Sequence, residues 1–348
     1  MEKEKGVVKK QISLVLAVVM AVVCSFPAFA QEADQQKIVV SMSTIEGLLS
    51  DYSLEIRTVV NNLKLAKDSC EDYEGTEQEE YYENQYDIAQ EQYDNKVQQQ
   101  VLSAKQQYIT FCADSARLSE DQSELDSLNN KLALYKTELG KGYLSQKDYD
   151  DMADQAAQAK NTLTEQDDKV TREKKDIETT LNLPSGVSVK FQPLSDVDFS
   201  EIAQINYSTD AVVMYNKNSA ITSEGMNYDY IKDSGTATSW ETDNARILLE
   251  QTAEDQKREF RQLYDTLMES YQTYLQDSAS LKRQESDVQT QQQMLQLGYV
   301  SAQTVTDANL QLQTAKTSLA SEAGSLYAAY LSYLHMKNGY SISGSAIG

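Results

Sequence analysis

The chain contains two copies of one long pattern. The segment Gly142-Tyr143-Leu144-Ser145 returns as Gly298-Tyr299-Val300-Ser301, which places the second glycine 156 residues after the first. On both sides of each segment, apolar or small residues recur at alternating steps of three and four, the period of a heptad seam. A repeat of this length corresponds to half of a folded domain and not to one unit of a short solenoid.

The heptad pattern predicts the content of each half. The positions of the second-half seam include Phe260, Tyr264, Leu267, Tyr271, Tyr274, Leu281, Val288 and Leu295, and those of the first half include Ala104, Tyr108, Phe111, Leu118, Leu125, Leu132 and Leu139. Because the two series keep the same register, each half is predicted to be a long antiparallel helical hairpin bent at a glycine. The expected fold class is all-α, with two tandem coiled-coil hairpins.

Proline marks the joint between the halves. Only Pro184 and Pro193 follow residue 30, and an interior proline costs a helix about 3 kcal/mol. We therefore expect a signal peptide over 1–30, a first helical repeat over 31–197, a second over 198–340 and a disordered tail over 341–348.

Each repeat is expected to contain the same elements. In the first, these are a helix over 41–67 with a capping box at its start, an acidic loop over 68–77, a helix over 78–139, a turn over 140–144 and a helix to about 180. In the second, they are a helix over 198–223, a loop over 224–239, and helices over 240–297 and 302–338. Ser145 and Ser301 are expected to cap the returning helices.

The N-terminus has the features of a secretory signal. Lysines precede an apolar run from Ile12 to Val23, and Ala28-Phe29-Ala30 follows as a cleavage site. Cys24 suggests a lipid anchor as an alternative, but Val23 is larger than the residue that such processing favours. We expect ordinary cleavage and export of a chain that does not cross a bilayer on helices.

The acidic charge excludes some partners. The net charge is -23, and removal of four lysines and two glutamates with the leader lowers it to about -25. Such a surface repels nucleic acid, so we expect no nucleic-acid partner. The mature chain has two cysteines, Cys70 and Cys112. A turn near Gly75 would place Cys70 opposite residues near Glu80, far from Cys112 along the helix axis, so two free thiols are expected.

Nothing in the sequence suggests catalysis. His335 is the single histidine and has no neighbouring cysteine, and no zinc cluster, catalytic triad or phosphate-binding glycine loop can be assembled. We expect no enzyme activity and no catalytic, cofactor or metal site. Calcium binding by the run from Asp68 to Glu80 is an alternative, but its carboxylates lack the regular spacing of a known loop.

The two turns and the twofold repeat resemble the TolC-type outer-membrane efflux family over essentially the whole mature chain. The closest correspondence is Lys141-Gly142-Tyr143-Leu144-Ser145 with Asp148, and Leu297-Gly298-Tyr299-Val300-Ser301 with Asp307. The segment from Ser43 to Lys67 also resembles the opening of the family's repeats, without its Asn-Pro.

The resemblance implies a function as well as a fold. It implies a homotrimeric α-barrel that works with a periplasmic adaptor (membrane-fusion) protein and an ABC or other inner-membrane pump. The adaptor would dock on the two glycine turns, at 142–145 and 298–301. Asp148 and Asp307 match acidic positions that ring the constricted end of the family's conduit.

The distal loops depart from the family. A barrel strand that crosses an outer membrane needs about 9–11 residues, and the loops at 68–77 and 224–239 leave almost no room for such strands. We therefore expect little or no β-barrel. The expected location is the cell envelope or extracellular face, after secretion across the cytoplasmic membrane, with outer-membrane association as an option.

Simpler interpretations remain open at this point. Most glycines of this kind only end helices, and Asp148 also suits the dipole at a helix start. The alternative function is that of an extracellular coiled-coil scaffold or adhesin.

Overall fold

The computed structural model of the protein describes residues 37–194 and 197–342, so the signal peptide predicted over 1–30 lies outside the described residues. The chain divides into two compact units. The described part of the first consists of residues 37–38 and 186–188, in which the Ile38 amide donates to the Ser188 carbonyl at 3.0 Å. The second unit contains every helix of the described residues, and the following paragraphs concern it.

The first repeat consists of four helices. They are α2 (Ile45–Tyr52), α3 (Leu54–Asp72), α4 (Glu79–Gly140) and α5 (Gln146–Thr180). The single helix predicted over 41–67 is therefore wrong in detail. The chain breaks at Ser53, whose extended backbone starts α3 and whose hydroxyl accepts a hydrogen bond from the Ile56 amide. The capping box predicted at the start of α2 is also absent, because the helix begins after Thr44 and no side-chain hydrogen bond caps it.

The second repeat has its helices in the same order as the first, with one additional short helix at its start. Its elements are η1 (Ile202–Gln204), α6 (Tyr207–Lys217), α7 (Ser219–Asp233), α8 (Ser239–Gln296) and α9 (Ala302–Lys337). The loop predicted over 224–239 is wrong for most of its length, because α7 continues to Asp233.

Two side chains explain the bounds of α7 and α8. Asn218 is fully buried, accepts from the Ala220 and Ile221 amides at 3.1 Å, and donates to the Gln256 side chain. Thr238 and Glu241 form a capping box at the start of α8. The loop between the two helices is therefore shortened to residues 234–238.

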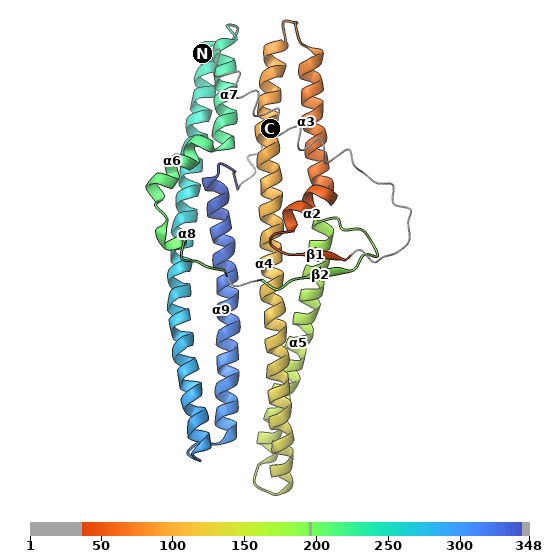
Figure 1. The fold of residues 1–348 in the computed structure, drawn as a ribbon, viewed down its shortest axis with the longest axis vertical. Helices are drawn as coiled ribbons and strands as arrows, with labels where there is room; N and C mark the ends of the chain where they lie inside the picture. Colours follow the sequence, from red (N-terminus) through yellow and green to blue (C-terminus); the bar gives the residue numbers. More distant parts are fainter. Residues whose placement is uncertain (1–36, 195–196, 343–348) are drawn as a thin grey trace. The chain divides into compact units, whose positions relative to one another are not determined.

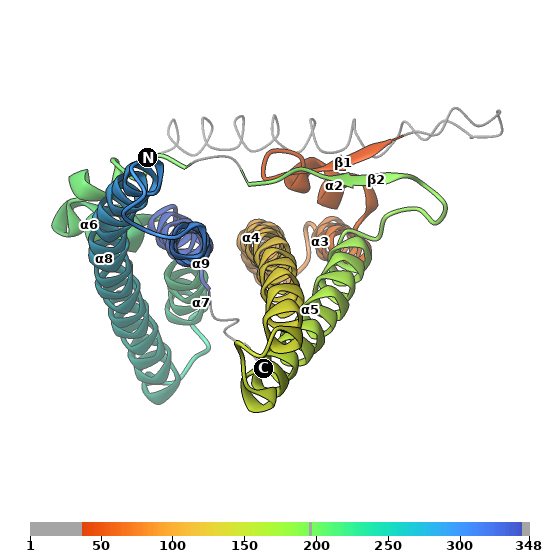
Figure 2. The same cartoon turned by 90° about the horizontal axis from the view of Figure 1, so that it is seen from below.

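The helices pack side by side along their lengths (Figures 1 and 2). α4 packs on α5, α8 packs on α9, and α4 packs on α9 where the two repeats meet. The predicted seams are buried at Tyr108, Phe260 and Leu267, each 1% exposed or less. Where α4 meets α9 the Ile109 side chain packs closely on Gly324, because a Cβ at Gly324 would lie 3.2 Å from it. Among the described residues, no helix is both long enough and apolar enough to cross a membrane.

The connector between the repeats crosses α4. Its strand β2 (Val189–Phe191) pairs with β1 (Ile38–Val40), and the Gln192 amide donates to the Val40 carbonyl at 3.0 Å. The Tyr108 hydroxyl donates to the Gln192 carbonyl, and the rings of Phe111 and Phe191 lie 4.7 Å apart. Side chains of the first seam thus hold the connector in place.

The C-terminal segment returns to the helices. The Ser219 amide donates to the Gly339 carbonyl at 2.8 Å, and Gly339 has a φ of 102°, which other residues rarely adopt. Disorder was predicted from residue 341, but Ser341 is buried and its amide donates to Asn95 at 2.7 Å. Residues 343–348 lie outside the described part of the chain.

Candidate functional site

The α4–α5 turn ends its long helix with a glycine in the left-handed region. Gly142 has a φ of 76°. Its amide donates to the Leu139 carbonyl at 3.0 Å, and the Tyr143 amide donates to the Glu138 carbonyl at 2.9 Å. These bonds satisfy carbonyls that the helix end leaves free, as in a Schellman motif. An L-residue at position 142 would strain this turn.

The α8–α9 turn has the same geometry. Gly298 also has a φ of 76°, its amide donates to Leu295 at 3.0 Å, and the Tyr299 amide donates to Met294 at 2.9 Å. Both turns lie at the same end of the second unit, at the bottom of Figure 1. The two halves of the sequence repeat therefore form turns with matching hydrogen bonds, and both turns lie at the same end of this unit.

A serine caps the helix that leaves each tip, as predicted. Ser145 accepts from the Asp148 amide and Ser301 from the Thr304 amide, both at 3.1 Å. Asp148 is exposed, and it accepts a hydrogen bond from the Ser145 hydroxyl at 2.6 Å. The carboxylate therefore completes the cap and complements the positive end of the α5 dipole.

The side chains that follow the glycine of each turn are exposed to solvent. Tyr143 is 81% exposed and Tyr299 is 78% exposed, while Leu144 and Val300 are half-buried beside them. Leu297 is 70% exposed, although it comes from the apolar pattern of α8. Each tip therefore exposes one aromatic side chain, with a smaller apolar side chain half-buried beside it.

Asp307 is not a free carboxylate. Lys131 on α4 lies 2.5 Å from it across the boundary between the repeats, and the Gln303 amide donates to the same oxygen at 2.9 Å. The hydrogen bond from the Lys131 ammonium lowers the pKa of the Asp307 carboxyl below its usual value. Asp148 and Asp307 thus have different partners: one caps a helix, and the other joins two hairpins.

Lys131 is the partner of Asp307, and the sequence analysis does not predict this pairing. It lies in a polar stretch of α4, 176 positions from Asp307, and nothing in the heptad pattern indicates that the two residues face each other. The exposed Leu297 could have been noticed, because it directly precedes the conformationally special Gly298.

His335 is buried in the structure. Its ring packs near Tyr340 and lies 3.4 Å from the Ser341 carbonyl. Burial lowers the pKa of the imidazole to about 4, which keeps it neutral. In the part of the chain that the structure describes, no group of three or more His, Cys, Asp or Glu side chains could hold a metal ion.

No protein-family profile and no curated protein sequence matches this chain. Solved structures do match it. A membrane protein from Pseudomonas aeruginosa aligns with a TM-score of 0.66 and 11% identity, over 92% of this chain and 98% of that one.

Two further matches are named as outer-membrane proteins. The CmeC outer membrane channel of Campylobacter jejuni has a TM-score of 0.65 at 8% identity, over 92% of this chain and 95% of that one. VceC of Vibrio cholerae has a TM-score of 0.62 at 10% identity, over 87% of this chain and 97% of that one. These identities are low and the likeness is one of fold. The chain therefore has the helical-hairpin fold of the TolC-like outer-membrane channels.

Proposed function

We propose that this chain is a TolC-like duct component of a tripartite efflux or secretion system, and that its two tips dock an adaptor protein. The observation that carries the proposal is the pair of matched turns at 142–145 and 298–301, which present Tyr143 and Tyr299 to solvent at one end of the molecule. A turn that only ended a helix would not need exposed aromatic side chains in both copies.

The arrangement of the helices supports a homotrimer. α4 and α9 have neighbours on both sides, whereas α5 packs on α4 alone among the long helices, and α8 packs on α9. Apolar side chains along α8 are exposed at Ile247, Leu248, Leu275 and Met294. Contact between α8 of one copy and α5 of the next is heterologous, and such contacts build a closed ring when the rotation is right.

The partners follow from this proposal. They are a periplasmic-adaptor-type (membrane-fusion) protein at the tips and an ABC or other inner-membrane pump beyond it. The chain would be secreted across the cytoplasmic membrane and work in the cell envelope, in association with the outer membrane or at the extracellular face. Within the chain, residues 31–197 and 198–340 would be the two functional repeats.

We also propose that Asp148 and Asp307 line the constricted end of the duct. Asp148 is exposed next to the first tip, and the Asp307 side chain is 43% exposed while paired with Lys131. In a ring of three copies these carboxylates would recur around the axis and favour the passage of cations over anions.

Site-specific photocrosslinking tests the docking claim. A photoreactive residue at Tyr143 or Tyr299 should capture a protein that mass spectrometry identifies as an adaptor with a helical hairpin. The same residue at Tyr81, which is exposed near the α3–α4 loop, is the control and should not capture it. Equal capture from Tyr81 would refute docking at the tips.

Sedimentation tests the assembly claim separately. The purified chain should sediment with the mass of a trimer at micromolar concentration. An elongated monomer that stays monomeric would refute the ring, whatever the crosslinking gives.

A further inference from the structure

The α8–α9 hairpin contains a carboxyl oxygen that is buried without a partner. Glu322 lies on α9, two residues before Gly324, and it is half-buried. Its Oε2 atom is buried and has no hydrogen-bond partner in the part of the chain that the structure describes. An ionised carboxylate in this position costs free energy, because it loses water without gaining a donor.

A second carboxyl group faces Glu322 from the other helix of the hairpin. Asp277 on α8 is half-buried and lies within hydrogen-bonding reach of Glu322. Ionised carboxylates only accept hydrogen bonds, so two of them cannot bond to each other. One proton changes this, because a protonated carboxyl group has an O–H that donates to the other group. The pair therefore forms its hydrogen bond only when it holds a proton.

The first repeat shows which kind of side chain suits this position. Gln166 precedes Glu322 by 156 residues, the same separation as that of the two tip glycines. Its amide donates to Asp114 on the facing helix, at 2.9 Å to the backbone carbonyl and at 3.0 Å to the carboxylate. A side chain at this position thus donates to an aspartate across the hairpin. Glutamate resembles glutamine in shape, but it can donate only when it is protonated.

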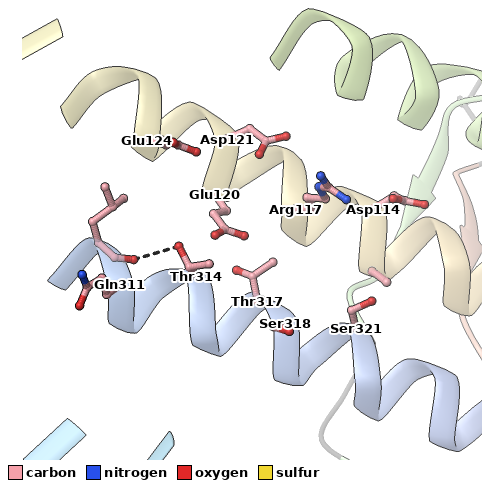
Figure 3. A pocket seen from close by; sticks show the side chains of 12 residues that line it. Asp114, Arg117, Glu120, Asp121, Glu124, Gln311, Thr314, Thr317, Ser318 and Ser321 are labelled. Atoms are coloured by element: carbon pink, nitrogen blue, oxygen red, sulfur yellow. Dashed lines mark hydrogen bonds between the residues drawn. The ribbon is translucent and has the colours of Figure 1, made fainter. Parts of the chain in front are cut away.

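Other charged groups lie along α9 or the helices packed on it, and most of them already have partners. They are Lys316 with Glu285 of α8 at 3.0 Å, Asp210 of α6 with Lys337 at 2.9 Å, Glu201 with Tyr330 at 2.9 Å, and Asp114 of α4 with Lys169 at 2.8 Å. Arg117 lies one turn from Asp114 on α4, opposite Ser318 and Ser321 of α9 (Figure 3).

Burial and Asp277 together favour the neutral form of Glu322. Burial, a hydrogen bond with Asp277 and the charge of Asp277 raise the pKa of Glu322 above its ordinary value, and the Ser318 hydroxyl opposes them more weakly. The charge that acts most strongly on Glu322 is thus that of the facing aspartate.

We propose that Glu322 and Asp277 share one proton, which holds α8 against α9 at acidic pH and is released to solvent as the pH rises. Because the pKa of Glu322 is raised, the contribution of the pair to stability is complete below pH 4.5 and is lost as the pH rises through the folded value. Glu322 lies close to the contact of Gly324 with Ile109, so the proton acts where α9 packs on both α8 and α4. This inference does not rest on the proposed duct function.

Hydrogen exchange followed by mass spectrometry, at about pH 5 and about pH 8, tests the proposal. Glu322→Gln keeps a donor to Asp277 at every pH. Peptides that cover residues 270–282 and 316–328 should therefore exchange at least about threefold more slowly than in the wild type at pH 8, and at nearly the same rate at pH 5. The matched control is Glu269→Gln, which removes the same charge from an exposed position on α8 and should exchange as the wild type does.

Asp277→Asn is a second variant, which supplies the donor from the other side of the pair. Its amide can donate to the ionised Glu322, so the same peptides should again exchange more slowly at pH 8. Because both changes act on one contact, the combination of Asp277→Asn with Glu322→Gln should add little further protection.

Three results would overturn the proposal. They are unchanged exchange in both variants at pH 8, equal slowing at pH 5 and pH 8, and equal slowing in the control Glu269→Gln. The second result would mean that packing explains the effect, and the third that the lower net charge explains it. Circular dichroism checks that each variant is folded, and Asp277→Asn decides the question if Glu322→Gln is not.

Discussion

Replacing Glu173 with glutamine should stabilise the first hairpin at alkaline pH and leave it nearly unchanged at acidic pH. Glu173 on α5 lies beside Asp114 on α4, and its Oε2 atom is buried without a hydrogen-bond partner in the described chain. Burial and the neighbouring Asp114 carboxyl raise the pKa of Glu173 from 4.5 to about 7. The ionised form of Glu173 is therefore the unfavourable one in the folded protein.

The sign and size of the effect follow from linkage. Because the pKa of Glu173 is raised in the folded protein, its contribution to the free energy of unfolding is complete below pH 4.5. This contribution is lost as the pH rises through about 7. At 1.36 kcal/mol per pKa unit the upper limit is about 3 kcal/mol. Burial also acts on Asp114, but hydrogen bonds from Lys169 and Gln166 outweigh it and lower its pKa, which adds stability above pH 3.8. Since the two carboxyls share one environment, we expect about 1–2 kcal/mol for Glu173.

Urea denaturation followed by circular dichroism at about pH 5 and pH 8.5 measures this difference. Glu173→Gln should raise the free energy of unfolding at the higher pH by about 1–2 kcal/mol and change it by less than about 0.5 kcal/mol at the lower one. Glu165→Gln, an exposed change on the same helix, is the control. The same shift at both pH values would show that packing, and not ionisation, explains the result.

Three further changes test other parts of the structure. The double variant Gly142→Val/Gly298→Val should lower the free energy of unfolding by about 1–2 kcal/mol per site, because φ is 76° at both. Its helical circular dichroism should be kept, while its crosslinking to the adaptor falls. Unchanged crosslinking would mean that the tips are only turns. Tyr333→Phe should destabilise the protein by about 1.5–3 kcal/mol in urea, since its buried hydroxyl donates to the Asp210 carboxylate at 2.7 Å; a loss below about 0.5 kcal/mol would contradict this. Gly339→Ala should cost about 1–3 kcal/mol, because its Cβ would overlap a backbone carbonyl, and a neutral effect on the melting temperature would argue against that contact.

Local chemistry explains which features the sequence could predict. The glycines at 142 and 298 and the serines at 145 and 301 act on their immediate neighbours, so their roles follow from a few adjacent residues. The heptad seams also follow, because one face of each helix must be buried. The Thr238 to Glu241 capping box has a signature that is visible in the sequence. The prediction misses it because it starts the helix at Trp240, one residue after the observed start at Ser239.

Contacts between distant segments could not be predicted in the same way. The break at Asn218 depends on the amide of Gln256, and the pairing of Asp307 depends on Lys131. To predict either contact, one must know how each helix is rotated relative to its neighbour. The spacing of apolar residues by three and four does not determine this rotation.

The close contact between Gly324 and Ile109 also has a mechanical consequence. About 31 residues of α4, or about 46 Å, separate Ile109 from the first tip. If one hairpin rotates against the other about this contact by about 5°, the tip moves by about 4 Å, while the contact itself hardly moves. The Lys131 to Asp307 pair at 2.5 Å lies on the moving side of this pivot. In such a rotation Gly324 would lie at the pivot, far from the tips, and the ion pair between Lys131 and Asp307 would oppose the movement.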